Sequence, residues 1–267
     1  MFSKLHIDGF TLKVIAIVGM TTNHVAHAFF YALPFWLLFA LYAFGGLTYC
    51  IMAYLVVEGY LHTSNIRRYA TRLGIFALVA QIPFSLLFGM LGNVLITLLV
   101  GLGILWAYDH IKSRPLFVLV LILGCAITFK CDWAIIGPLI VFLFYYLRNR
   151  GRRGIAITMA VPYATMIVPA LLRLPAEISH GLSKGANALA AGVDDLYMIV
   201  EFAGIPLLLN GQSLTDICSL GYAFIGFTLA MILLMNYNGQ RGRPMKWFFY
   251  AYYPLHLLVI WAAKMLI

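Results

Sequence analysis

The chain contains long stretches without a charged residue, and these stretches limit the folds open to it. No Asp, Glu, Lys or Arg occurs in the 44 residues between Lys13 and Glu58, or in the 36 residues that precede Asp109. A helix needs about 20 apolar residues to cross a bilayer, so each stretch has room for two membrane-spanning helices. Turns are expected near residues 32–34 and 89–92, where proline or glycine interrupts the apolar run.

Composition excludes a soluble protein. Of the 267 residues, 63% are hydrophobic and only 10% are charged, whereas soluble domains carry about 25% charged residues. Disorder is excluded because it requires low hydrophobicity. Strands of a membrane barrel alternate polar and apolar residues, but these runs are apolar on every face. We therefore predict an all-α, polytopic transmembrane helical bundle that forms a single domain over residues 1–267.

The formal net charge of +9 comes from basic residues that lie between the apolar runs. Cytoplasmic membrane loops explain this excess, so no nucleic-acid partner is expected. The four cysteines show no CxxC or Cys/His spacing. They are interpreted as small buried hydrophobic residues, and no metal is expected.

The distribution of basic residues predicts the orientation in the membrane. Lys and Arg gather in the loops 60–72, 109–114 and 148–153, whereas the turns near residues 33 and 91 carry no charge. Cytoplasmic loops are enriched in Lys and Arg. The N-terminus and these three loops are therefore expected on the cytoplasmic side.

One loop conflicts with a simple count of spans. The loop 237–246 is also basic, but it falls on the opposite side if residues 154–172, 194–212 and 217–236 each cross the membrane. It returns to the cytoplasmic side if the segment 173–212 does not cross. That segment holds Glu177, Asp194, Asp195 and Glu201. Nine spans are therefore favoured, with ten as the alternative.

Polar residues within the first apolar run are candidates for function, because ionisable groups are costly in a membrane. Lys13 and His24 are separated by ten residues. Eleven steps of about 100° bring them onto one helix face, about 16 Å apart. One group would then lie near the membrane surface and the other at depth. Buried imidazole is a suitable general base near neutral pH, so His24, with its neighbour Asn23, is a catalytic candidate.

A second polar group follows the next apolar run. Glu58 and His62 are four residues apart and would touch on a helix. Arg67, Arg68 and Arg72 follow at once. These arginines either anchor the helix at the interface or bind phosphate groups, since guanidinium makes bidentate contacts with phosphate.

The remaining candidates lie in later apolar runs. His256 follows Tyr253 and Pro254 in the last run, where a proline kink beside a histidine indicates more than core packing. Asp132 separates two runs that are each too short to span a bilayer, which predicts a hairpin with a polar tip or half-helices that line a cavity. Five residues are candidates to line or support an acceptor path, namely Glu58, His62, Asn93, Asp132 and Tyr253.

These residues occur within segments that resemble the TraX family of conjugal-transfer membrane proteins, which includes the F-pilin N-acetylase. The matching stretches are LKVIAIVGMTTNH (12–24), LVVEGYLHTSNIRRYATRLGIFALVAQIPF (55–84), GNVLITLLVGL (92–102), DWAIIGPLIVFLFYY (132–146) and YYPLHLLV (252–259). They follow one another along almost the whole chain. The family usually has Asp-His in the first span, where this chain has Asn23-His24.

The spacing from Lys13 to His24 is also similar to the basic-x10-His motif of wider membrane acyltransferase families. In those families the histidine is taken as the catalytic base, and a basic pair after the next span is implicated with the acyl donor. Arg68 and Arg72 occupy the corresponding positions. The resemblance implies an enzyme of the bacterial inner membrane, in contact with lipid, that transfers an acetyl or acyl group from acetyl-CoA.

The resemblance also suggests roles and acceptors. His24 would accept a proton from the acceptor, and Asn23 or His256 would orient the imidazole or stabilise the oxyanion. The N-terminal amine of a pilin is the implied acceptor, and a saccharide hydroxyl fits as well. Two other functions stay open. Short broken helices at 115–147 are compatible with a transporter, and a non-catalytic assembly partner would tolerate substitution of both histidines.

Overall fold

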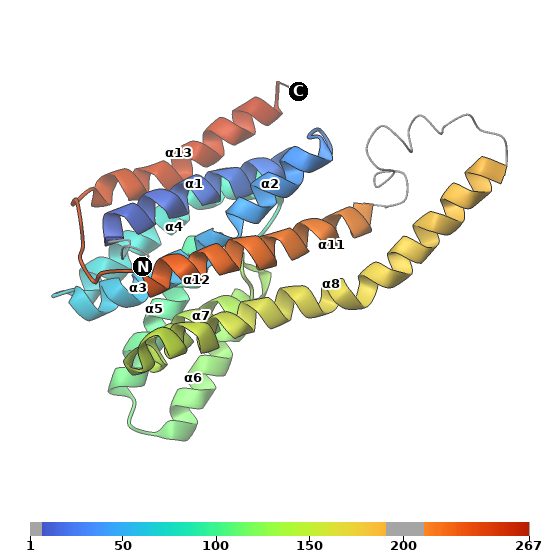
Figure 1. The fold of residues 1–267 in the computed structure, drawn as a ribbon. Helices are drawn as coiled ribbons and strands as arrows, with labels where there is room; N and C mark the ends of the chain where they lie inside the picture. Colours follow the sequence, from blue (N-terminus) through green and yellow to red (C-terminus); the bar gives the residue numbers. More distant parts are fainter. Residues whose placement is uncertain (1–6, 191–210, 267) are drawn as a thin grey trace, which may run out of the picture.

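The chain forms a bundle of helices (Figure 1). The computed structural model describes residues 7–190 and 211–266, and for parts of 170–190, for 211–213 and for Lys246 it describes the backbone alone. Its α-helices are α1 (Gly9–Ala28), α2 (Phe35–Gly45), α3 (Leu47–His62), α4 (Ile66–Phe88), α5 (Val94–His110), α6 (Arg114–Ile127), α7 (Ile136–Tyr146), α8 (Gly151–Ala190), α11 (Gly211–Gly221), α12 (Thr228–Met235) and α13 (Lys246–Lys264). No strand occurs within the described ranges, where β-structure is limited to two isolated bridges. The predicted all-α class is confirmed.

The membrane character of the bundle is also evident. Among the described residues, three helical segments are long and apolar enough to cross a membrane, namely Phe35–His62, Ile66–Phe88 and Leu214–Met235. Large apolar side chains such as Leu78, which is 71% exposed, lie on the outside of the bundle. Lipid is the environment in which such a surface is stable.

Both predicted turns are present, and local chemistry explains each. Pro34 precedes α2, and its missing N–H costs nothing at a helix start. Gly89 ends α4 in the left-handed conformation, with φ of 67°, which glycine adopts without a steric penalty. The Asn93 side chain then accepts a hydrogen bond from Leu95 N and caps α5.

Two helical segments differ from the expected runs. The segment expected at 154–172 is part of the 40-residue helix α8, which continues through Pro162 and Pro169. Prolines are tolerated in helices of membrane proteins because neighbouring groups satisfy the freed backbone carbonyls. The span expected at 217–236 begins earlier, within α11, continues through a π-helical segment (Tyr222–Phe227) and ends with α12 at Met235.

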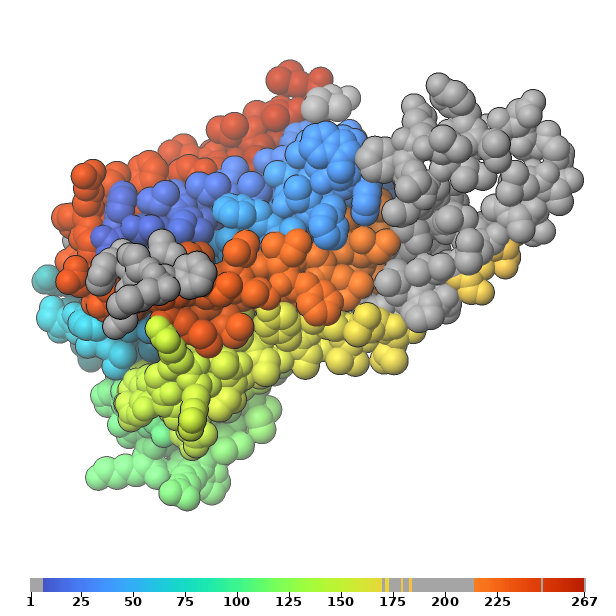
Figure 2. All heavy atoms as spheres, in the orientation of Figure 1, coloured from blue at the N-terminus to red at the C-terminus, as the bar shows by residue number. Residues whose placement is uncertain are grey.

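Packing around α1 positions the functional candidates. Helix α1 packs against α2, α3 and α13, and α13 also packs along α4. Figure 2 shows the same order on the molecular surface, with α1 and α2 (blue) between α13 (red) and α11–α12 (orange). Thr21 of α1 and Tyr252 of α13 are joined by a hydrogen bond of 2.8 Å between their hydroxyl oxygens. This bond fixes the register of α13 on α1.

The basic loop 237–246 lies at the N-terminal end of α1. Gly9 N donates to the Gln240 carbonyl at 2.7 Å, and Asn238 N donates to the Ile7 carbonyl at 2.9 Å. The loop therefore shares its end of the bundle with the N-terminus, as expected if the segment 173–212 does not cross. The acidic residues Asp194, Asp195 and Glu201 lie outside the described residues, and the number of spans stays a prediction.

Candidate functional site

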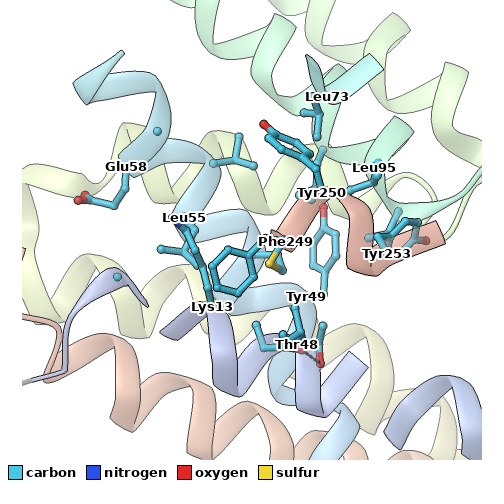
Figure 3. Close-up of a pocket in the computed structure, with 18 of the residues that line it drawn as sticks. Lys13, Thr48, Tyr49, Leu55, Glu58, Leu73, Leu95, Phe249, Tyr250 and Tyr253 are labelled. Atoms are coloured by element: carbon cyan, nitrogen blue, oxygen red, sulfur yellow. Dashed lines mark hydrogen bonds between the residues drawn. The ribbon is translucent and has the colours of Figure 1, made fainter. Parts of the chain in front are cut away.

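A cavity of about 630 Å³ runs through the bundle. Its walls come from α1, α3, α4, α5 and α13, with contributions from the α6–α7 connection, Tyr222 and the loop that follows α12. Figure 3 shows Lys13 and Glu58 toward one end and Tyr253 toward the other. The cavity thus joins helix ends near the N-terminus to side chains deep in the bundle.

The first end, here called the mouth, is basic. Lys13, Arg68, Arg72 and Arg241 all line it. Among the described residues, Glu58 is the carboxylate that lines the mouth, and it accepts a hydrogen bond of 3.2 Å from the Tyr237 hydroxyl. Positive charge therefore exceeds negative charge at the mouth.

Helix geometry selects two of the three predicted arginines. Asn65 caps α4 by accepting a hydrogen bond of 2.9 Å from Arg68 N. Arg68 and Arg72 are four residues apart, so they lie on one face of α4, and both line the cavity. Arg67 points elsewhere, is exposed and does not line it. The buried Nε of Arg72 has no hydrogen-bond partner among the described residues.

Arg241 was not predicted as a site residue. Its loop was considered only for orientation, and its place at the mouth depends on the hydrogen bonds that tie the loop to the start of α1. The charge of the loop 237–246, together with the nine-span count that places it on the same side of the membrane as the N-terminus, was the signal that could have found it.

The predicted contact between Glu58 and His62 is confirmed. Their side chains approach to 3.9 Å between His62 Nδ1 and Glu58 Oε2, and both line the mouth. His62 Nδ1 also donates to the Glu58 carbonyl at 2.9 Å. This pair lies at the surface of the bundle, whereas His24 and His256 are buried.

His24 lines the deep part of the cavity and is 4% exposed. Its Nδ1 lies 2.7 Å from Nε2 of His256, and Nδ1 of His256 lies 3.0 Å from the Tyr252 carbonyl oxygen. A carbonyl only accepts, so His256 Nδ1 carries the hydrogen. For neutral rings, His256 Nε2 is then an acceptor, and His24 Nδ1 must donate to it.

This chain of hydrogen bonds determines the tautomer of His24. With its hydrogen on Nδ1, the ring leaves Nε2 without a proton. Within the described residues, Nε2 takes part in no hydrogen bond. The rings of Phe88 and Tyr253 pack around the imidazole, with centroids 5.4 Å and 6.2 Å away. The arrangement presents an oriented, proton-accepting nitrogen inside an apolar pocket.

His256 therefore supports the site without lining the cavity, and Asn23 does line it. The Asn23 Oδ1 atom has no hydrogen-bond partner among the described residues. The imidazole of His24 is oriented by His256, which is one of the two alternatives that the sequence left open.

Other polar side chains gather in the deep part of the cavity. Asp132, Tyr49 and Tyr253 line it together with Trp133. The Tyr49 and Trp133 rings stack with centroids 4.2 Å apart. The hydroxyls of Tyr49 and Tyr253 are buried and lack hydrogen-bond partners within the described part of the chain. Tyr49 was not predicted, because a tyrosine in an apolar run is indistinguishable from core.

Asn93 is a structural residue and does not line the cavity. It is fully buried, and its side-chain nitrogen donates to the Ala77 carbonyl at 2.7 Å and to Gln81 Oε1 at 3.0 Å. Its polar atoms are thus used to join α4 to α5. Of the two roles expected for Asn93, lining or supporting an acceptor path, its place outside the cavity leaves the supporting one.

The described residues bring no group of three His, Cys, Asp or Glu side chains together in a way that could hold a metal ion. The cysteines Cys50, Cys125, Cys131 and Cys218 are all free.

The fold and the cavity define an all-helical membrane protein in which a basic mouth leads to a buried histidine pair. The TraX protein family model matches residues 8–264, and the chain belongs to this family. A curated relative is the probable fimbrial assembly protein FimC, serogroup H1, of Dichelobacter nodosus. It is 26% identical over 282 residues, which cover 99% of each chain. No solved structure matches the chain.

Proposed function

We propose that this protein is a membrane acetyltransferase that moves an acetyl group from cytosolic acetyl-CoA to an amine or hydroxyl acceptor. One observation carries the proposal: a single cavity joins a cluster of basic side chains to an imidazole nitrogen that is oriented to accept a proton. Coenzyme A carries phosphates at one end and the reacting thioester at the other, which matches this division of charge.

The mouth supplies the groups that would bind the donor. Arg68 and Arg72 would contact the phosphates with paired N–H donors, and Lys13 and Arg241 would add charge from the facing side. Lys13 and His24 are eleven residues apart on α1, or about 16 Å. The extended pantetheine arm of the donor would bridge this distance and bring the thioester to His24.

His24 would act as the general base. The acceptor nitrogen or oxygen attacks the thioester carbon as its proton passes to Nε2 of His24. The new bond to the acetyl group forms, the carbon–sulfur bond breaks, and the thiolate of coenzyme A takes the proton. General-base catalysis of this kind contributes about 10²–10⁴-fold in rate. His256 and the Tyr252 carbonyl would stabilise the transient imidazolium.

Asn23 is the candidate for oxyanion stabilisation. It precedes His24 in α1 and lines the same cavity, so its amide N–H could donate to the developing negative charge on the thioester oxygen. No covalent acyl-enzyme is required by this route.

The proposed cellular location and acceptor follow from the positions of the basic loops and from the name of the Dichelobacter nodosus relative. The basic loops and the mouth would face the cytoplasm, where acetyl-CoA is available, in the inner membrane of a bacterium. The name of the Dichelobacter nodosus relative concerns fimbrial assembly. A pilin-like protein with a free N-terminal amine is therefore the proposed acceptor, and a saccharide hydroxyl is the alternative.

The test uses membranes that contain the wild-type protein, His24→Gln or His27→Gln, incubated with radiolabelled acetyl-CoA. His27 is the matched control, because it lies one turn further along α1, bonds to Tyr42 and does not line the cavity. Label should enter a peptide or glycan fraction with wild type and His27→Gln, and not with His24→Gln. Equal labelling with His24→Gln at equal expression would contradict the proposal.

A further inference from the structure

Asp132 is a carboxylate without a basic partner in the deep part of the cavity. It forms no ion pair with a described residue, and the pair between His62 and Glu58 lies at the mouth. Asp132 instead lines the cavity together with Tyr49, Tyr222 and Tyr253. A carboxylate at membrane depth is costly unless it serves a function.

The backbone around Asp132 is fixed in an unusual conformation. Trp133 has φ of 63° and Ala134 has φ of 33°, values that residues with side chains seldom adopt. Thr97 Oγ1 donates to the Asp132 carbonyl at 2.6 Å, and Asp132 N donates to the Gly92 carbonyl at 2.8 Å. Such strain persists only where the surroundings hold it, and it concentrates at binding sites. The short helices α6 and α7 thus form a hairpin whose connection places Asp132 in the cavity.

Two buried hydroxyl groups of the same cavity lack hydrogen-bond partners among the described residues. Tyr49 is 1% exposed and Tyr253 is 3% exposed, and neither hydroxyl forms a hydrogen bond within the described chain. Buried polar groups are nearly always satisfied in proteins, so a bound ligand is the natural partner for both. The stacked rings of Tyr49 and Trp133 add aromatic surface at the same place.

We propose that Asp132, Tyr49 and Tyr253 form the subsite that binds the ammonium group of a primary-amine acceptor, with Trp133 as part of its wall. An ammonium group supplies the positive charge that Asp132 lacks and donates hydrogen bonds to the tyrosine oxygens. Aromatic rings also attract cations. A hydroxyl acceptor would leave the carboxylate unpaired, so this subsite selects amines. The assignment rests on the proposed acetyl transfer and names its acceptor class.

The position of the subsite agrees with the reaction. Tyr253 lines the same cavity as Asp132, and its ring packs against His24. An amine held by Asp132 and the Tyr253 hydroxyl would therefore lie toward the base. The two ends of the cavity divide the substrates by charge, with the anionic donor at the mouth and the cationic acceptor at Asp132.

Acetyl transfer to an ammonium group requires that two protons leave its nitrogen. The ammonium group gives one proton to Asp132, and the resulting amine attacks the thioester carbon. A second proton leaves the nitrogen for Nε2 of His24 and passes to the departing thiolate of coenzyme A. Asp132 releases its proton to water when the acetylated product leaves, so that one ammonium and one thioester yield one amide, one thiol and one proton.

Direct binding tests the subsite without any need for catalysis. The full chain in lipid nanodiscs is titrated with Gly-Gly-Gly amide and with glycolyl-Gly-Gly amide, which carries a hydroxyl in place of the terminal amine. Asp132→Asn is compared with Asp109→Asn, a control that makes the same change at an exposed aspartate outside the cavity. Wild type and Asp109→Asn should bind the amine peptide about tenfold or more tightly than the hydroxyl peptide, and Asp132→Asn should remove this preference.

Two results would overturn the assignment: equal affinity of wild type for both peptides, or an unchanged preference in Asp132→Asn. Tyr253→Phe removes a single hydroxyl and provides the same comparison if Asp132→Asn fails to fold. Label transfer from acetyl-CoA is measured on the same samples. Amine preference without any transfer would contradict the proposed function and leave the subsite standing, whereas transfer without amine preference would do the reverse.

Discussion

The two ends of the cavity are built in different ways. At the mouth, several long basic side chains from three segments of the chain share one region, and water can reach them. In the deep part, single groups with fixed partners determine the geometry, as His24 does through His256 and the Tyr252 carbonyl. Shared charge tolerates the loss of one member, but a chain of hydrogen bonds does not. Substitutions should therefore have graded effects at the mouth and severe effects at depth.

The largest effect among the supporting residues is expected at His256. His256→Ala removes the acceptor for His24 Nδ1, so the His24 tautomer is no longer fixed, and the rate of transfer should fall about 10²-fold. His256→Gln can still accept through its amide oxygen and should retain more activity than His256→Ala. Steady-state rates at saturating acetyl-CoA check this order. Equal loss in both variants would mean that His256 has a packing role alone.

A smaller effect is expected at the mouth. Arg68→Ala or Arg72→Ala should raise the KM for acetyl-CoA about tenfold, because each removes a charge-assisted contact, with little change in kcat. Arg67→Ala is the matched control, since Arg67 lies on the same helix outside the cavity. The defect should shrink as salt is added, because salt screens the wild-type contact as well. A kcat defect in Arg68→Ala would place that residue in the chemistry.

Substitution of Asn93 should lower the stability of the fold without changing donor binding. Asn93→Ala removes the side-chain donor to the Ala77 carbonyl and one of the two donors to Gln81 Oε1, whose bond from the backbone N–H of residue 93 stays. It also removes the cap of α5. Loss of about 1–3 kcal/mol in the free energy of unfolding is expected. Thermal unfolding in detergent measures it. The KM for acetyl-CoA of the folded fraction should stay at the wild-type value. A raised KM would mean that Asn93 contributes to binding in the cavity.

The smallest effect is expected at Asp8, which caps α1 outside the membrane. Its side chain accepts a hydrogen bond of 2.8 Å from Thr11 N, and hydrogen bonding from the Thr11 backbone holds the pKa of Asp8 below its ordinary value of 3.8. The cap therefore stabilises the fold above that value, and the contribution is lost as pH falls through the lowered folded pKa. Asp8→Ala should cost about 0.5–1 kcal/mol, with unchanged transfer. Unfolding curves of both proteins should converge as the pH falls through the lowered pKa of Asp8.

Much of the fold could be predicted from the sequence. The uncharged runs and their glycine and proline breaks located the turns at 32–34 and 89–92. Rotation of about 100° per residue placed Lys13 and His24 on one face, and both line the cavity. These predictions depend only on local periodicity and hydrophobicity. The α4 face that carries Arg68 and Arg72 follows from the same geometry.

The rest depends on contacts between distant segments. His24 and His256 are 232 residues apart, and no local pattern indicates which helix supplies the partner of a buried histidine. Arg241 reaches the mouth through backbone hydrogen bonds to residues 7–9. Asn93 was predicted to line or support an acceptor path, although an asparagine at the start of an apolar run is also a signal for a helix cap.

The central claim is that the cavity separates donor binding from proton transfer, and His24→Ala tests it most directly. The dissociation constant for acetyl-CoA and the rate of acetyl transfer are measured on the same purified sample in nanodiscs. The account predicts that His24→Ala binds acetyl-CoA within about twofold of wild type while the rate falls about 10²-fold or more. Transfer above about a tenth of the wild-type rate in His24→Ala would contradict the assignment of His24 as the base.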